Sequence, residues 1–254
     1  MLFLIIFLKR LEILDSLAIR LVVLTGKCRY PLHPKHLIRS GPLWFSKYLK
    51  KTDTVLDLGS DNGMHTLKSA RKVKNITGIE HQITSLRVAR ELACYQNIRN
   101  VQFLEGDLEK KLNFPSNKFN KVLFLDVLEH LNRRNQIMKE CYRVLKINGK
   151  LFISIPNSET RWKRLLRKNG INSFADPDHK IEYTRDEAIS VCTNVGFKVV
   201  SIDPITLDTP LSPIFGVVGG ISLALYKKLM EWKKNKILEN PEETVGFRIV
   251  AQKV

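Results

Sequence analysis

Short apolar segments alternate with helical patterns along most of this chain of 254 residues, and this alternation limits the folds open to it. Helices of about ten to fifteen residues between strands are typical of βαβ units, in which the strands lie parallel. Right-handed crossovers then give an α/β fold, a doubly wound sheet with helices on both faces. We expect strands at residues 54–59, 75–80, 101–107, 121–128, 150–157, 197–203 and 246–254.

The helices between these strands carry their own start and stop signals. Asn148 and Gly149 are predicted to end the helix that precedes the fifth strand. Thr184 and Glu187 form the sequence pattern of a capping box at the start of a later helix. We expect these helices at residues 64–73, 83–97, 135–146 and 184–196.

The stretch VLDLGSDNG, residues 55–63, joins the first expected strand to the first of these helices. Gly59 allows a sharp bend out of the strand, and Gly63 allows the helix to begin close to a ligand. Glu80 ends the second strand, 21 residues after Gly59, where an acid can accept hydrogen bonds from both hydroxyls of a ribose. Asp61 stands where a third glycine would be expected.

Two acids of this stretch decide between cofactors that carry an adenosyl ribose. Asp57 and Asp61 give the turn a negative surround, which repels a pyrophosphate. The same charges suit a cationic sulfonium and a free amino group. The electrostatics therefore favour S-adenosylmethionine over NAD.

Five segments in order carry a resemblance to a known family: VLDLGSDNG, ITGIE, FLEGDLEK, FNKVLFLDVLEHL and RVLKINGKLFISIPN. They resemble class I S-adenosylmethionine-dependent methyltransferases, and within these the type 11 group of quinone-biosynthesis, small-molecule and lipid enzymes. The resemblance covers residues 50–205 and the last strand. It implies a Rossmann-like, mostly parallel sheet of seven strands in the order 3-2-1-4-5-7-6, with the last strand antiparallel. It also implies S-adenosylmethionine as the cofactor and no metal.

The resemblance assigns cofactor-binding residues at the ends of the expected strands. Glu80 would hold the ribose, Asp107 would bond the adenine amino group, and Leu108 would contact the ring. Leu125 and Asp126 would face the methionine end of the cofactor. The loop around the methionine moiety would be formed by Asp57, Gly59, Ser60 and Gly63.

Methyl transfer from a sulfonium needs mainly positioning and exclusion of water, with a general base where the acceptor is a hydroxyl. His130, in DVLEHL, is the first candidate for this base and His179 is the second. The alternative is that His130 caps or packs the start of a helix. Two residues depart from the family pattern: Asp61 could narrow the cofactor pocket, and Asn120, at the far end of the fourth strand, should matter little.

The formal net charge of +17 favours an anionic partner, such as nucleic acid, anionic lipid or a phosphorylated compound. A generally basic surface is the alternative. Three cysteines in helical or apolar patterns are expected to be buried thiols in a reducing compartment: Cys94, Cys141 and Cys192. Three potential zinc ligands lie close in sequence, without a second cysteine pair to support a site: Cys28, His33 and His36.

Three additions to the expected domain are predicted to bind the acceptor. Residues 1–50 form an amphipathic, basic, helical extension, and residues 51–254 form the methyltransferase domain. Residues 157–183 contain RWKRLLRK. Residues 204–245 are a hydrophobic and basic insertion between the last two strands.

Two apolar segments of these additions point toward a membrane. Residues 209–226 carry no charge, but prolines and glycines argue against a continuous spanning helix. We predict a hydrophobic lid or interfacial segment there, with Trp232 and lysines at the headgroups; a hairpin packed over the domain's own core is the alternative. Residues 1–8 are expected to contact a membrane or hydrophobic partner, and residues 11–24 to pack as a helix on the domain.

Together these features predict a methyltransferase acting on a small-molecule, lipid-linked or glycan-type acceptor, a quinone-like one included. We expect the protein to lie in the cytoplasm. The additions leave open that it attaches peripherally to the anionic inner face of the membrane. An RNA methyltransferase is the alternative from charge, although no NPPY-type tetrapeptide follows the fourth strand. A non-catalytic cofactor-binding or scaffold protein is a third reading, motivated by Asp61.

Overall fold

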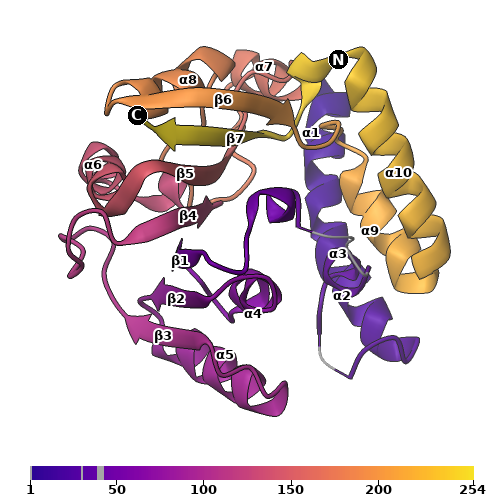
Figure 1. Cartoon of the computed structure of the whole chain (residues 1–254). Coiled ribbons are helices and arrows are strands. Elements are labelled where there is room, and N and C mark those ends of the chain that lie inside the picture. The colour runs from indigo at the N-terminus through magenta and orange to yellow at the C-terminus, as the bar shows by residue number, and fades with distance from the viewer. Residues whose placement is uncertain (1, 30, 39–42) are drawn as a thin grey trace. The chain divides into compact units, whose positions relative to one another are not determined.

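The computed structural model of the protein describes residues 2–29, 31–38 and 43–254, with only the backbone of His36. These residues form two compact units, which we describe one at a time (Figure 1). The sheet unit comprises Pro42–Pro156, Ala175–Asp203 and Phe247–Val254. The helical unit comprises Met1–Gly41, Asn157–Phe174 and Pro204–Gly246. This division differs from the predicted boundary at residue 50, because the segment 43–49 belongs to the sheet unit.

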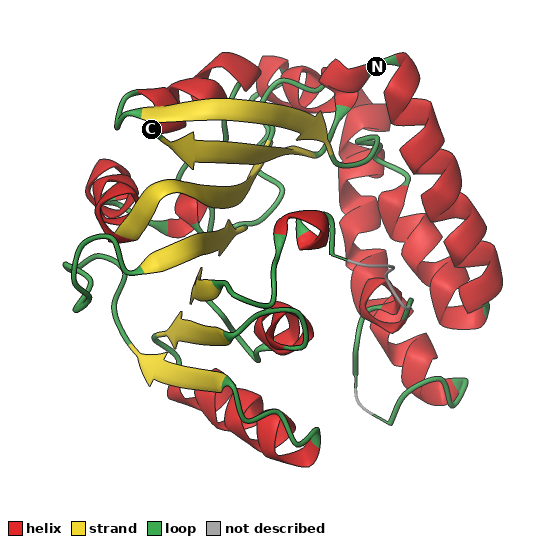
Figure 2. Ribbon diagram, in the orientation of Figure 1, coloured by secondary structure: helices red, strands yellow, loops and turns green. Residues whose placement is uncertain are grey.

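The sheet unit is built on one seven-stranded sheet in the order β3-β2-β1-β4-β5-β7-β6, as the resemblance implied. The strands from β3 to β5 pair in parallel. Figure 2 shows β7 running opposite to its neighbour β6, so the sheet is mixed at this edge. The bounds are β1 Thr54–Leu58, β2 Asn75–Glu80, β3 Val101–Glu105, β4 Phe119–Leu125, β5 Leu145–Pro156, β6 Phe197–Pro204 and β7 Gly246–Lys253.

Neighbouring residues of the central strands enter opposite cores, because successive side chains of a strand point to opposite faces. Leu56 and Phe124 pack in one core with α6 and α8, whereas Val55 and Leu123 pack in the other with α4. Helix α5 covers β3 through a third cluster around Phe103. Helices therefore cover both faces of the sheet. The bounds are α4 Met64–Ala70, α5 Ile83–Tyr95, α6 Arg134–Val144 and α8 Arg185–Thr193.

Two expected boundaries were wrong, and one of them lies next to the site. Strand β4 ends at Leu125, three residues early, and the chain turns into a short 3-10 helix at Leu128–His130. Helix α6 ends at Val144. Asn148 and Gly149 do not end this helix as predicted, because they lie inside β5. The pairing of β4 with β5 shifts register there, so these two residues form a bulge in the strand.

Two further local predictions have clear outcomes. The capping box of Thr184 and Glu187 is present at α8. Cys141 and Cys192 are buried, but Cys94 is exposed. Ala93 already ends the buried face of α5, and the next residue along a helix points about 100° away from it.

The helical unit contains the long N-terminal helices and the insertion between β6 and β7. The insertion forms a helical hairpin, α9 and α10, in which α9 packs along α2 (Figure 1). Among the described residues, no helix combines the length and apolar character that a membrane span requires. The bounds are α1 Leu2–Arg10, α2 Leu14–Leu24, α3 Pro34–Leu37, α7 Arg161–Lys168, α9 Ser212–Ile221 and α10 Leu223–Glu239.

The glycines of α9 form its contact surface, although the sequence suggested that they would interrupt the helix. A Cβ at Gly220 would lie 2.6 Å from Leu21 Cβ and 2.9 Å from Ala18 O, so only glycine allows α2 to come this close. The α9 helix ends at Ser222, whose hydroxyl accepts the Leu225 N–H at 3.4 Å and caps α10. The segment is therefore a packed hairpin, and its partner within the helical unit is the N-terminal helix α2.

Replacing Gly220 with valine should destabilise the helical unit by about 1–3 kcal/mol, because the added side chain forces α2 and α9 apart. Ala224→Val is the matched control, since Ala224 is exposed on α10. Urea unfolding followed by circular dichroism measures both. Equal stabilities of the two variants would contradict the close packing.

Candidate functional site

The turn after β1 is held against the end of β2 by backbone hydrogen bonds. The N–H groups of Gly59 and Ser60 both donate to Ile79 O, at 2.9 Å each. Gly59 has a φ of +74°, and a Cβ on it would lie 2.4 Å from Val127 Cγ2. Glycine is therefore required here by both conformation and space.

Asp61 fits the turn in the place of the missing glycine. Its φ is +44°, a left-handed value that aspartate tolerates better than most residues. Its N–H donates to Glu80 Oε2 at 3.1 Å, and its Oδ1 accepts the Ser85 hydroxyl at 2.8 Å. The turn therefore keeps its glycine-like geometry while gaining a carboxylate.

Glu80 ends β2 and is buried, with both oxygens engaged by backbone N–H groups. Oε1 accepts from His81 at 2.8 Å and from Gln82 at 2.9 Å, and Oε2 accepts from Asp61. An oxygen of a carboxylate has about two acceptor positions, so Oε2 retains one and Oε1 has none left. This arrangement suits one ribose hydroxyl better than the two that the sequence suggested.

A cavity of about 740 Å³ opens where β1, β2, β3 and β4 end. Seven of the predicted site residues line it: Gly59, Glu80, Asp107, Leu108, Leu125, Asp126 and His130. A smaller cavity of about 160 Å³ shares part of this wall and adds Asp57 and Ser60. The cavities thus bring together residues that lie far apart in the sequence.

The larger cavity is acidic, in a chain with a net charge of +17. One lysine, Lys180, belongs to its lining, together with His81 and His130. Six acids line the same cavity and outnumber the lysine and the two histidines: Asp61, Glu80, Asp107, Glu109, Asp126 and Asp178. Such a wall favours a ligand that carries positive charge.

Asp57 and Ser60 form the floor of the smaller cavity. Asp57 is buried on β1 and accepts the Thr66 hydroxyl at 2.6 Å. Burial raises the pKa of Asp57, against the charge of His65 and the bond from Thr66. The Ser60 hydroxyl is buried and finds no hydrogen-bond partner among the described residues, so it is available to a ligand.

Asp107 and Asp126 face the larger cavity from exposed positions. The Glu109 N–H donates to Asp107 Oδ1 at 2.9 Å, and this bond lowers the pKa of Asp107. Asp126 has a φ of +56°, a left-handed value that aspartate tolerates better than most residues. Both carboxylates are therefore held at strand ends, where the sequence placed them.

Gly63 and His179 do not line either cavity. Gly63, at φ +78°, caps α4, and a Cβ on it would lie 2.7 Å from Phe103 Cζ. Its glycine is explained by the packing of α4 against β3 and α5. The predicted reason, closeness of the helix start to a ligand, stays a prediction.

The two candidate bases have different positions. The rings of His130 and His179 lie edge to face, with centroids 4.8 Å apart, but His130 alone of the two reaches the cavity. The His179 Nδ1 lies 3.0 Å from Glu182 Oε1. Burial by itself would lower the pKa of His179, but Glu182 and the nearby charges of Glu129 and Asp176 outweigh it and raise the pKa.

Glu129 is a site residue that sequence reasoning did not assign a role, although it stands in the DVLEHL motif. It is 2% exposed, and its Oε1 lies 3.9 Å from His179 Nε2. Its Oε2 has no hydrogen-bond partner among the described residues. Burial raises the pKa of Glu129 to about 7. The sequence does not predict that Glu129 is buried, because a short 3-10 turn shows no periodic pattern of apolar residues.

Three side chains here offer ligand atoms that a metal ion can use: Glu129, His130 and His179. These atoms lie within 4.8 Å of one another. Donor atoms about 2 Å from a tetrahedral zinc ion lie roughly 3.4 Å from one another, so this group would have to contract to share one ion. The absence of a metal stays a prediction. The zinc group suggested by Cys28 and His33 includes the His36 side chain, which lies outside the described residues.

Comparisons with known proteins agree on the fold and on the kind of domain. The family model described as "Methyltransferase domain" matches residues 49–196. A ubiquinone biosynthesis O-methyltransferase of Rattus norvegicus is 29% identical over 105 residues, which are 41% of this chain and 30% of the relative. The enzyme of that name from Glaesserella parasuis is 32% identical over 145 residues, which are 52% of this chain and 59% of the relative.

Solved structures show the same fold at low identity. A putative methyltransferase from Bacillus halodurans has a TM-score of 0.59 and 19% identity, and the match covers 81% of this chain and 94% of that one. An S-adenosylmethionine-dependent methyltransferase from Methanosarcina mazei has a TM-score of 0.57 and 20% identity, over 82% and 95% of the two chains. The chain thus spans most of these structures, but between 30% and 59% of the two curated relatives above.

The raised pKa of Glu129 predicts a pH-dependent stability that its glutamine variant lacks. Between about pH 4.5 and 7 the folded protein keeps a proton that the unfolded chain has lost, so stability falls as pH rises, by up to about 3 kcal/mol. Chemical unfolding at about pH 5 and pH 8 should show a smaller difference for Glu129→Gln than for the natural chain.

Glu140→Gln is the control for this measurement, since hydrogen bonds from Arg143 lower the pKa of Glu140. That change should leave the difference between pH 5 and pH 8 nearly unchanged, because a lowered carboxylate pKa affects stability mainly below about pH 4.5. A Glu129→Gln variant that loses stability equally at both pH values would contradict the buried, protonated Glu129.

Proposed function

We propose that this chain, which belongs to the family of class I S-adenosylmethionine-dependent methyltransferases, methylates an oxygen atom of a small acceptor with an apolar body. The observation that carries the proposal is the acidic cavity at the strand ends of a strongly basic chain. A cationic methyl donor is the cofactor that such a cavity favours.

The residues present fit S-adenosylmethionine. A cavity of about 740 Å³ lies within the usual range for sites of small ligands. Glu80 keeps an acceptor position on Oε2 for a ribose hydroxyl, and Asp107 offers its carboxylate toward an adenine amino group. Asp57 and the unpartnered Ser60 hydroxyl would meet the amino acid end in the smaller cavity.

S-adenosylmethionine supplies an activated methyl group on its sulfonium when it is bound. The chain itself has to orient the two reactants and exclude water, which is the main requirement of such a transfer. Leu125 and Asp126 line both cavities, so they belong to the wall nearest to the methionine end. Val127 and Leu131 add an apolar surface to the same wall, where an acceptor ring can pack.

His130 would remove the proton of an acceptor hydroxyl. It lines the cavity, and its Nδ1 lies 3.4 Å from Asp178 O, which fixes the ring when that nitrogen carries hydrogen. The other nitrogen is then the free acceptor for the proton. His179 packs against the His130 ring and would act as a positioning residue.

The acceptor class follows from the relatives and from the helical unit. The two curated relatives described above are named as O-methyltransferases of ubiquinone biosynthesis, and for this chain we propose an acceptor with a hydroxyl group and an apolar tail. The helical unit adds an apolar surface suited to such tails. Of the 23 exposed large apolar side chains among the described residues, sixteen belong to this unit, although it has less than half of the chain.

An anionic bilayer is the surface that we propose for the helical unit. Helix α1 exposes Phe3 and Phe7, 84% and 54%, four residues apart on one face. Lys9 and Arg10 are the last two residues of the same helix. Trp232 is exposed on α10, which also carries lysines. Apolar side chains with basic neighbours are typical of helices that lie in the interface of an anionic membrane.

Replacing His130 with glutamine should lower kcat for methyl transfer by about 100-fold or more, because the general base is lost. A demethylated short-chain ubiquinol serves as the acceptor, and calorimetry with S-adenosylmethionine checks that cofactor affinity is kept. His179→Gln is the comparison and should show a smaller loss. A His130 variant with full kcat would exclude it as the base.

The double change Phe3→Glu and Phe7→Glu should abolish flotation with vesicles of phosphatidylcholine and phosphatidylglycerol, because the exposed face of α1 becomes anionic. Ile83→Glu with Val88→Glu, on α5 of the sheet unit, is the matched control and should float like the natural chain. Equal flotation of the two variants, or none for the natural chain, would contradict the membrane proposal.

A further inference from the structure

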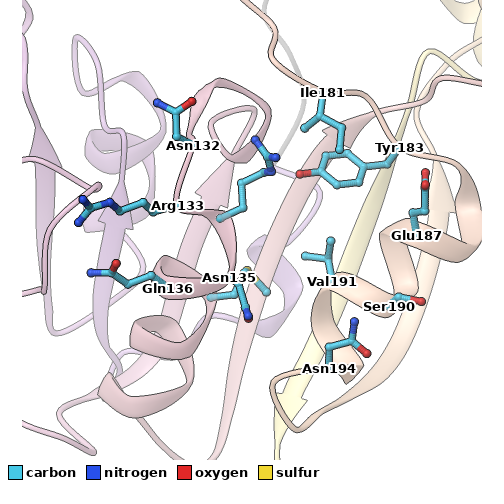
Figure 3. Close-up of a pocket in the computed structure, with 12 residues that line it drawn as sticks. Asn132, Arg133, Asn135, Gln136, Ile181, Tyr183, Glu187, Ser190, Val191 and Asn194 are labelled. Carbon is cyan, nitrogen blue, oxygen red and sulfur yellow. The ribbon is translucent and has the colours of Figure 1, made fainter.

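A second cavity, of about 780 Å³, lies in the sheet unit between α6 and α8 and is as large as the cofactor cavity. Figure 3 shows side chains from the start of α6 on one side and from α8 on the other. The proposed methyl transfer uses none of these residues. Leu131 lines the cofactor cavity and Asn132 lines this one, so the two cavities meet at one short segment of chain.

Tyr183 provides the first evidence for a ligand. It is 2% exposed, and its hydroxyl finds no hydrogen-bond partner among the described residues. Figure 3 shows the ring reaching across from the α8 side, with the hydroxyl oxygen facing the space between the two groups of side chains. A buried hydroxyl without a partner costs free energy, which a ligand in this cavity can recover.

The hydroxyl of Tyr183 is a donor at every physiological pH. Burial raises its pKa, against the nearby charge of Arg134. The Tyr183 N–H donates to Pro156 O at 3.0 Å, so the residue is anchored to the end of β5. Its ring packs in the core beside α6 and α8. The donor is therefore fixed in place before a ligand arrives.

The remaining polar side chains of the cavity are two arginines, one acid and several neutral amide or hydroxyl groups, so the lining carries a net positive charge. Arg133 and Arg134 stand at the N-terminus of α6, where the helix dipole adds to their attraction for anions. Arg134 Nη1 donates to Leu131 O at 2.5 Å, which fixes the guanidinium. Glu187 is an acid of this lining, but its Oε2 accepts the Thr184 N–H in the capping box.

The wall between these groups is apolar. Met138 is 1% exposed on α6, and Ile181 and Val191 are partly buried beside it. A fully hydrated inorganic ion would leave this wall without a contact. A compound with a small apolar body and one charged end would use both the wall and the donors.

We propose that the cavity between α6 and α8 is a binding site for a small organic oxyanion, distinct from the cofactor site. The oxyanion accepts from Tyr183 and from Arg134 of α6, and the apolar body lies on Met138, Ile181 and Val191. A carboxylate and a phosphate both offer this chemistry.

Calorimetric titration of the whole chain without cofactor or acceptor tests the site apart from methyl transfer. The probes are benzoate, phenyl phosphate and benzamide, the last being the neutral isostere of benzoate. Benzoate or phenyl phosphate should bind, the tighter of the two identifying the preferred oxyanion, and benzamide should not. Failure of both anions to bind at millimolar concentration, or equal binding of benzamide, would overturn the proposal.

Tyr183→Phe separates a ligand role from a structural one. The change removes only the unpartnered hydroxyl, so stability in urea should be unchanged or higher, while affinity for the anion falls roughly tenfold. Tyr142→Phe is the control, because the Tyr142 hydroxyl donates to Val254 O at 3.1 Å. It should lose stability and keep affinity. A destabilised Tyr183→Phe, or one with unchanged affinity, would overturn the proposal.

Discussion

The carboxylate of Glu80 holds together the two strand ends on which the cofactor site depends. Its oxygens accept N–H groups from Asp61, in the turn after β1, and from His81 and Gln82, in the turn after β2. Two turns that are twenty residues apart in sequence thereby share one buried acid. Breaking these bonds would loosen the turn after β2 and remove one anchor of the turn after β1, whose other backbone anchor is Ile79 O.

The charge of the chain is divided in a way that serves this site. Most of the surface is basic, yet the cavity at the strand ends gathers six carboxylates around one lysine. Carboxylates so close together repel one another, and a cationic ligand relieves the repulsion. The same basic surface, with apolar residues of the helical unit, suits an anionic membrane. The acidic groups therefore face the cofactor site, whereas the basic groups face the surroundings of the protein.

The sheet and most of the cofactor residues could be predicted because local rules decide them. Strand and helix periods gave the elements, and the family resemblance gave the strand order and placed Glu80, Asp107 and Asp126 at one edge. The helical unit could not be predicted in this way. Gly216 and Gly220 look like helix breakers in sequence, but they are the contact between α9 and α2, a pairing of segments nearly two hundred residues apart. The burial of Glu129 and the unpartnered Tyr183 hydroxyl depend on tertiary packing in the same way.

The central claim, that Glu80 and the acidic cavity hold S-adenosylmethionine, is tested most directly by calorimetry on the natural chain and on Glu80→Gln. The natural chain should bind S-adenosylmethionine and its demethylated product and should not bind NAD. Glu80→Gln should weaken that binding by roughly tenfold or more, because a charge-assisted acceptor is lost and the turn loosens. Binding of NAD in place of S-adenosylmethionine, or equal affinity in the glutamine variant, would contradict the account.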